Sequence, residues 1–365
     1  MAITRITLAD LVFGEPLRWD LFSAPAAPSP VLQKGQLLAP GPQLDGWLAD
    51  GLYADQPPPS VLHSLNQLNA RLEQTLVDLR DQASADIALR AIAGELTATV
   101  RRDPDIALAA LFLNQIAGPY GVRHCTETAI VVSLVAQAMG KSAPECLIVT
   151  AAALTMNVGM VRQADLFQTR DGALTSEERA LVRRHPNVGV DLLRWAGVTD
   201  EEWLSYVLLH HENDDGSGYP EGRLGHEIAQ NAKLIGLADR YCAFVSARNY
   251  RRSLLPPEAL ARLGAEHAMP LDPSVLDHFA QQIGAFPPGT LVRVQNGATG
   301  VVVSRPETDG SLRLCLLRGA DGNTLAQPEH CLTSTDQFAI AEALHEDQAR
   351  LRFTMKQVWG DMASL

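Results

Sequence analysis

The middle of the chain constrains the fold most strongly, because it predicts one helix after another. Between about Asp105 and Gly284 the pattern is typical of helices joined by short turns. One start is marked by Thr175-Ser176-Glu177-Glu178, in which a hydroxyl side chain caps the helix and acidic residues suit its positive dipole end. The predicted helices span 107–116, 122–139, 144–154, 176–196, 201–210, 228–249, 256–266 and 273–283. The sequence therefore predicts a mainly α protein built around a helical bundle.

Two other patterns precede this region. Residues up to about 60 mix short apolar runs with the proline-rich stretches 24–30 and 56–59, which indicates short strands and turns in a small N-terminal α/β unit. From Val61 leucines recur at steps of three and four and mark one helix face, at Leu65, Leu68, Leu72, Leu76 and Leu79. The repeat is short, so we interpret this face as core rather than as a free-standing coiled coil, although it would also suit a homodimer.

The pattern changes again after residue 286. The runs 291–294, 300–303 and 312–317 are rich in β-forming residues and are separated by Asn-Gly and Asp-Gly turn signals. They predict a short antiparallel β segment, and a final helix is expected from about Thr335 to Met362. The expected domains are an N-terminal unit at 1–60, connecting helices at 61–105, the helical domain at 106–285, the β segment at 286–334 and the C-terminal helix at 335–365.

Composition narrows the classes of function. The 42 acidic and 30 basic side chains give a formal net charge of −12, which disfavours binding to a nucleic-acid polymer. The five cysteines stand singly, so neither a disulfide framework nor a zinc ribbon is expected. The longest apolar runs, 129–139 and 146–154, are shorter than the roughly 20 residues of a membrane helix, and the N-terminus does not resemble a signal peptide. We expect a cytoplasmic protein without a membrane segment.

Four histidines and one aspartate of the predicted helical region have the residue types of a metal site. They come from separate helices, at His124, His185, His210, His211 and Asp239. Facing helices of a bundle can direct imidazoles and a carboxylate onto one cation, and a bound cation can activate water for the hydrolysis of a phosphate ester. The spacing alone leaves two alternatives open: these side chains converge, or they have separate core and surface roles.

The block from His210 to Pro220, with the sequence HHENDDGSGYP, resembles the signature of the HD-GYP family. The resemblance continues through 222–225, Asp239 and 248–251 and covers about residues 124–283. Members of this family are bacterial phosphodiesterases that linearise the second messenger cyclic di-GMP. The resemblance implies an HD-type helical bundle, a metal-dependent hydrolase chemistry and cyclic di-GMP as ligand.

The resemblance also implies roles for single residues. It assigns metal-ligand positions to the five residues of the candidate site, that is, to His124, His185, His210, His211 and Asp239. It makes Gly218, Tyr219 and Pro220 the exposed loop through which the family contacts diguanylate-cyclase (GGDEF) proteins. Arg248 and Arg251 correspond to a basic segment near the nucleotide, where a guanidinium could bind phosphate or stack on guanine. The alternative for both arginines is solvated charge at a helix end.

The sequence departs from the family where the name-giving His-Asp pair and a following lysine should stand. Met156 replaces the histidine, Asn157 the aspartate and Met160 the lysine. A neutral amide and a thioether are poor ligands for Mg, Mn or ferrous iron, and the lost lysine removes a positive charge that could stabilise phosphate. A bridged pair of metal ions is therefore not expected; the remaining residues could hold one divalent metal (Fe, Mn or Mg) weakly, or none.

Three functions follow from these observations. The leading hypothesis is a cyclic di-GMP signalling protein that binds the nucleotide, a diguanylate-cyclase partner or both, with lost or strongly reduced phosphodiesterase activity. The first alternative is an active phosphodiesterase that uses a reduced metal site. The second alternative is a non-catalytic adaptor that recognises its partners through the N-terminal unit and the β segment.

Overall fold

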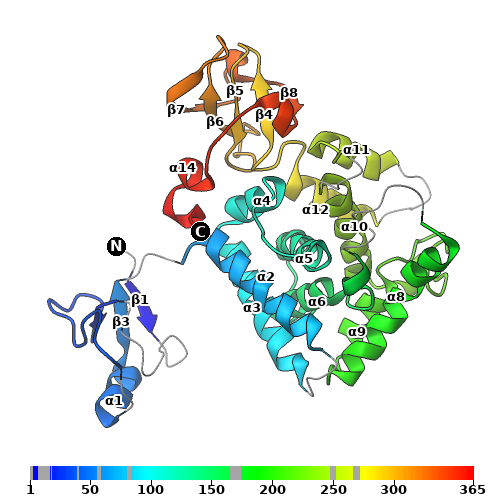
Figure 1. The fold of residues 1–365 in the computed structure, drawn as a ribbon, viewed down its shortest axis with the longest axis horizontal. Helices are drawn as coiled ribbons and strands as arrows, with labels where there is room; N and C mark the ends of the chain where they lie inside the picture. The colour runs from blue at the N-terminus through cyan, green and yellow to red at the C-terminus, as the bar shows by residue number, and fades with distance from the viewer. Residues whose placement is uncertain are drawn as a thin grey trace. The chain divides into compact units, whose positions relative to one another are not determined.

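A computed structural model shows the architecture of the chain (Figure 1). Two compact units are present, Met1–Ser60 and Val61–Leu365. The residues that the structure describes are 3–6, 17, 19–38, 41–55, 59–79, 84–164, 174–246, 252–265 and 272–365.

The first unit is a small antiparallel sheet with one helix. Strands β1 (Ile3–Ile6) and β2 (Leu21–Phe22) pair with opposite edges of β3 (Leu52–Asp55), and α1 (Pro42–Asp50) runs directly into β3. Their apolar side chains form a separate small core that includes Leu21 and Leu44. The predicted N-terminal α/β unit is confirmed.

The second unit begins with a bundle of helices, as the sequence predicted. The helices are α2 (Val61–Val77), α3 (Ala85–Arg102), α4 (Pro104–Phe112), α5 (Tyr120–Ala138), α6 (Ala143–Thr155), α8 (Ser176–Trp195), α9 (Glu201–Leu209), α10 (Gln230–Val245), α11 (Pro256–Ala265) and α12 (Pro273–Ile283). Reciprocal capping boxes start two of them: Ser142 and Glu145 at α6, and Thr175 and Glu178 at α8. In each box the side chains satisfy amide groups that the first turn leaves without a backbone partner.

Helix α5 lies at the centre of the bundle, where α2, α3, α4, α6 and α10 surround it (Figure 1). Almost every residue from Gly121 to Ala136 is buried, which explains why its second half, 129–136, is apolar at every position except Ser133. The leucine stripe of α2 is also buried in this core, with Leu65 and Leu72 completely inaccessible. The interpretation of the stripe as core is confirmed, and its leucines are not available as a dimer surface. Because α2 and α3 share the core of the later helices, the expected domain boundary at residue 105 stays a prediction.

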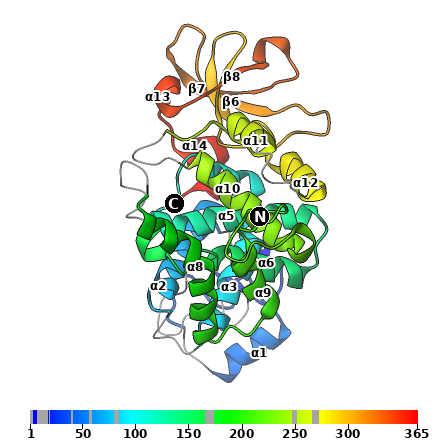
Figure 2. The same ribbon diagram turned by 90° about the vertical axis from the view of Figure 1, so that its right-hand side faces the viewer.

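A five-stranded antiparallel sheet follows the bundle and lies at one end of it (Figure 2). The strands β4 (Leu291–Val294), β5 (Thr299–Val302), β6 (Arg313–Arg318), β7 (Thr324–Leu332) and β8 (Ile340–Leu344) have the spatial order β7-β6-β5-β4-β8. The Arg305 guanidinium joins sheet to bundle, because its Nε donates to Asp105 Oδ1 at 2.9 Å and its Nη1 to Gln282 Oε1 at 2.8 Å.

The expectation of one long C-terminal helix is wrong. Residues 340–344 pair with β4 as a further strand, and the helical parts are short: α13 (Glu346–Ala349), α14 (Met355–Trp359) and the 3₁₀ segments Asp336–Phe338 and Gly360–Ala363. The edge of β4 offers backbone hydrogen bonds that a mixed-charge sequence pattern does not reveal. Arg350, at φ 52°, then ends α13 in the left-handed conformation, and the Trp359 indole donates to the Val303 carbonyl at 2.9 Å.

In the described part of the chain, no helix is both long enough and apolar enough to span a bilayer.

Two isoleucines on α3 test where the core lies. Ile92 is 1% exposed and Ile87 is 71% exposed. Ile92→Ala is expected to lower the free energy of unfolding by about 2–5 kcal/mol because it leaves a cavity, whereas Ile87→Ala should change it by less than about 0.5 kcal/mol. Urea unfolding followed by circular dichroism measures both. Equal effects of the two substitutions would contradict this assignment of the core.

Candidate metal centre

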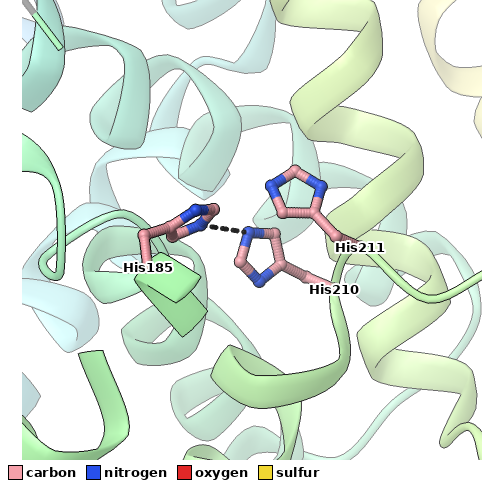
Figure 3. A group of neighbouring side chains, drawn as sticks. All are labelled: His185, His210 and His211. Atoms are coloured by element: carbon pink, nitrogen blue, oxygen red, sulfur yellow. Dashed lines mark hydrogen bonds between the residues drawn. The ribbon is translucent and has the colours of Figure 1, made fainter. Parts of the chain in front are cut away.

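Side chains from four helices meet at one point of the bundle. His124 lies on α5, His185 on α8 and Asp239 on α10, while His210 and His211 end α9. Figure 3 shows His185, His210 and His211 turned toward one another. One nitrogen from each of these three lies within 4.8 Å of the others. The sequence left open whether these residues converge or have separate roles. In the structure they converge.

The aspartate links His124 to this histidine cluster. Asp239 Oδ1 is 2.7 Å from His124 Nε2, and Asp239 Oδ2 is 4.0 Å from His211 Nδ1. Although burial alone raises the pKa of the Asp239 carboxyl, the hydrogen bond from His124 and the surrounding imidazoles hold it well below its usual range. Asp239 is therefore an ionised carboxylate among imidazoles.

A proline orients His185. The next residue, Pro186, lies inside α8 and has no N–H, so it cannot donate the helical hydrogen bond to the Val182 carbonyl. His185 Nδ1 is 2.6 Å from that carbonyl oxygen instead. A carbonyl only accepts, so Nδ1 carries the proton and Nε2 keeps its lone pair.

The end of a helix orients His210 in the same way. Helix α9 ends at Leu209, which leaves its last carbonyls without helical partners. His210 Nδ1 is 2.7 Å from the Val207 carbonyl oxygen and so also carries the proton. Both imidazoles thus present an unprotonated Nε2 to the centre of the cluster.

These two nitrogens are 3.4 Å apart, the contact drawn as a dashed line in Figure 3. Two lone pairs at this distance repel unless a proton or a cation lies between them. Burial, and repulsion by His210 when that imidazole is protonated, lower the pKa of His185 to about 3. Burial also lowers the pKa of His210, so a proton between the two nitrogens is disfavoured. Nitrogens bound to one tetrahedral metal ion at ~2.05 Å lie about 3.3 Å apart. The donor set therefore fits one metal ion.

The residues that replace the His-Asp pair lie in the turn after α6. Met156 is fully buried and Met160 is partly exposed. Asn157 is 5% exposed, and its Oδ1 has no hydrogen-bond partner among the described residues. A neutral amide cannot bridge two cations as a carboxylate does, so the residues present do not fit a second metal ion.

Gly159 fixes this turn against the histidine cluster. A Cβ at this position would lie 2.2 Å from the His185 carbonyl oxygen and 2.8 Å from the Gly189 nitrogen. Only glycine allows the turn to approach α8 so closely. The turn that follows α6 therefore packs directly against the backbone of α8 at His185.

The loop Gly218-Tyr219-Pro220 covers the cluster. We expected an exposed loop, but Tyr219 is only partly exposed and its ring lies 4.7 Å from that of His211. Gly218 is required at its position, because a Cβ there would lie 2.5 Å from the Glu212 Cα. Burial raises the pKa of the Tyr219 phenol, so its oxygen stays protonated.

Glu212, which the sequence reasoning had not singled out, holds the loop in place. Its buried carboxylate accepts hydrogen bonds from three consecutive backbone amides: those of Glu221 (2.7 Å), Gly222 (3.0 Å) and Arg223 (3.0 Å). Glu212 directly follows the histidine pair, so it couples the loop to the end of α9. No sequence pattern marks this role, because the amides belong to residues nine to eleven positions further on.

Three further arginines bear on the site, two of them expected from the sequence. The expected ligand-binding residues Arg248 and Arg251 lie outside the described residues. Arg183, which no motif indicated, has its guanidinium carbon 5.0 Å from the centre of the Tyr219 ring. Only the folded loop brings these two residues together.

Comparisons with known proteins agree with this geometry. Residues 106–275 match the family model described as HD domain. A cyclic di-GMP phosphodiesterase of Pseudomonas aeruginosa, PA4108, is 32% identical over 213 residues, which are 58% of this chain and 50% of the relative. The cyclic di-GMP phosphodiesterase response regulator RpfG of Xanthomonas campestris is 34% identical over 148 residues, 40% of this chain and 39% of the relative. Residues 106–275 are thus similar to the HD domain family. The chain spans about half the length, or less, of these two relatives.

A solved structure has a similar fold. The protein described as Bd1817, a HDG"Y"P protein from Bdellovibrio bacteriovorus, aligns with a TM-score of 0.50 at 15% identity and covers 76% of this chain and 98% of that one. A further relative, a 3'3'-cGAMP-specific phosphodiesterase of Vibrio cholerae, is 25% identical over 170 residues, 46% of this chain and 36% of the relative. The printed names of these relatives differ in the cyclic dinucleotide that they hydrolyse.

The close approach at Gly159 can be tested against a glycine in open space. Gly159→Ala should destabilise the protein by about 1–3 kcal/mol, because the added methyl group meets backbone atoms of α8. Gly264→Ala is the control, since nothing lies within 4 Å of a Cβ there, and it should leave stability unchanged or slightly higher. Urea midpoints measure both. A neutral Gly159→Ala would show that the turn does not lie against His185.

The role of Glu212 predicts a local effect. Glu212→Ala removes the acceptor of three partly buried amide hydrogen bonds, so the amides of Gly222 and Arg223 should exchange with deuterium about tenfold faster or more. Glu221→Ala, which removes only an exposed partner of Arg223, should leave these rates nearly unchanged. Hydrogen exchange with mass spectrometry measures both, and equal rates in the two variants would argue against a positioning role.

Proposed function

We propose that this chain is a cyclic di-GMP signalling protein whose HD-GYP domain binds the nucleotide but has lost, or retains very little of, the phosphodiesterase activity. One observation supports this most strongly. The histidine cluster is fully assembled around two unprotonated nitrogens, whereas the position of the name-giving aspartate holds an amide whose oxygen has no partner among the described residues. Ligand binding and hydrolysis therefore depend on different parts of the site.

The histidine cluster would hold a single divalent ion, through His185, His210 and His211, with Asp239 and His124 beside it. A bound ion would supply positive charge to a phosphate oxygen. His185 and His210 are held in the ligating tautomer by Val182 and Val207, and these hydrogen bonds are independent of residues 156–160. The cluster can thus bind a phosphate diester without the lost pair.

Hydrolysis requires more than the cluster offers. An attacking hydroxide at neutral pH needs strong electrostatic activation, and two cations bridged by a carboxylate provide it. Asn157 supplies neither the negative charge nor the second bridging oxygen, and Met160 supplies no positive charge for the phosphate. We therefore infer that a bound nucleotide stays largely intact.

Cyclic di-GMP is the proposed ligand because the relatives with the higher identities carry it in their names. The relative named for 3'3'-cGAMP makes that dinucleotide the competing ligand. We also propose that the Gly218–Pro220 loop contributes to a contact with a diguanylate-cyclase protein. Only part of Tyr219 is exposed, so such a partner would bind over the mouth of the histidine cluster.

A slow phosphodiesterase is the second candidate. It is favoured by the three nitrogen donors within 4.8 Å, since one hydrolytic metal ion with three protein ligands is a known type of catalytic site. The two candidates make opposite predictions about turnover, which one experiment can decide.

Restoring the lost residues tests the proposal. The wild-type protein should bind cyclic di-GMP and at most one metal ion per chain without steady turnover. The variant Met156→His/Asn157→Asp/Met160→Lys should bind two ions and hydrolyse the nucleotide about 10²-fold faster or more, because the bridging charge returns. Elemental analysis, calorimetry and chromatography of the products measure these quantities.

His210→Ala in both backgrounds is the control, since it should abolish the metal site and any activity that depends on it. Steady turnover by the wild type that His210→Ala removes would establish the phosphodiesterase instead. A wild type that binds neither metal nor cyclic dinucleotide would contradict both candidates.

A further inference from the structure

A stack of three side chains leads from the histidine cluster to the surface. The rings of His211 and Tyr219 are 4.7 Å apart and inclined by only 31°, so they lie nearly parallel. The guanidinium carbon of Arg183 lies 5.0 Å from the centre of the Tyr219 ring. Arg183 is exposed, whereas Tyr219 is partly buried and His211 touches the other imidazoles. The stack therefore places a positive charge at its exposed end, outside the cluster.

The hydrogen-bond donors of Arg183 have no acceptor among the described residues. Other arginines of the domain pair with carboxylates: Arg194, on the same helix, pairs with Glu201 at 3.0 Å, and Arg223 pairs with Glu221 at 2.7 Å. A guanidinium that rests on an aromatic ring is held in one place while its in-plane N–H groups point away from the ring. Such a group is preorganised to bind an anion with little loss of side-chain entropy.

The charges around the stack favour an anion as well. Asp239 is the carboxylate bonded to the cluster, and it is already shared with His124. The next residue on α10, Arg240, brings a second guanidinium, whose Nη2 donates to Asn213 Oδ1 at 3.3 Å. Two guanidinium groups, of Arg183 and Arg240, thus accompany the one carboxylate of the cluster.

We propose that Arg183 is an anion-binding residue of this site and contacts a phosphate of the cyclic dinucleotide, with Tyr219 as its positioning residue. The inference rests on the proposed nucleotide binding. A cyclic dinucleotide carries two phosphates on opposite sides of its ring, so one can lie at the histidine cluster while the other meets the guanidinium at the rim. Arg183 then determines how tightly the ligand is held, not how fast it reacts.

Removal of the charge is the first test. Arg183→Ala should weaken cyclic di-GMP binding about ten- to hundredfold in 50 mM NaCl, the usual range for a lost hydrogen-bonded charge contact. The difference from the wild type should shrink in 500 mM NaCl, because salt screens a contact at the surface. Arg184→Ala is the matched control, since Arg184 is the next residue on α8, is also exposed and should leave the affinity within about twofold. Isothermal titration calorimetry measures all three proteins.

The positioning role of Tyr219 has its own readout. In a double-mutant cycle, Tyr219→Leu should weaken binding, and Arg183→Ala should add little to it, because the guanidinium has already lost its support. Tyr219→Phe keeps the ring and should bind like the wild type. Fully additive effects of Tyr219→Leu and Arg183→Ala would overturn the positioning role.

The outcomes separate this inference from the function on which it rests. A wild type that does not bind cyclic di-GMP removes the proposed function and the inference together. A wild type that binds, with Arg183→Ala unchanged or Arg184→Ala equally weakened, removes only the inference. A loss in Arg183→Ala that is the same at both salt concentrations would indicate stacking on a base and would overturn the phosphate contact. Circular dichroism of each variant checks that the exposed substitutions leave the fold intact.

Discussion

Two hydrogen bonds from imidazoles to main-chain carbonyls determine the chemistry of this site. Val182 and Val207 offer carbonyl oxygens without helical partners, one because Pro186 has no N–H and the other because α9 ends. Each bond places the proton of an imidazole on Nδ1 and leaves Nε2 facing the opposite ring at 3.4 Å. Neither bond needs a metal ion or a charged neighbour, so the cluster is built by the backbone itself.

Because the backbone orients these histidines, the histidine cluster does not depend on the side chains at residues 156–160. Met156, Asn157 and Met160 carry no charge, and the turn next to them is fixed by the contact of Gly159 with α8. The hydrogen bonds that orient the histidines do not involve these three side chains, so the cluster forms without a charge that could hold a second cation. The loop above the cluster is equally independent, because Glu212 anchors it through main-chain amides.

Much of the fold followed from local patterns. The helices between residues 105 and 284 were predicted because capping residues and apolar faces are properties of consecutive positions. Strand β8 was predicted as helix. It is a strand because its backbone pairs with the edge of β4, a long-range contact that the mixed charges of 335–362 do not reveal. Glu212 and Arg183 were missed for a related reason: their partners lie in a loop whose path only the folded chain defines.

The sequence by itself determined which chemistry is possible. The four histidines and Asp239 supply donors for one cation, and Asn157 excludes a bridging carboxylate whatever the fold. It could not determine whether those donors meet, since they come from four helices and their convergence depends on packing around α5. The sequence also could not predict that Arg183 lies beside the site. Arg183 precedes Tyr219 by 36 residues, and the two meet only because the folded loop carries Tyr219 to α8. Residue types limit the reactions, whereas distances between helices decide which residues act together.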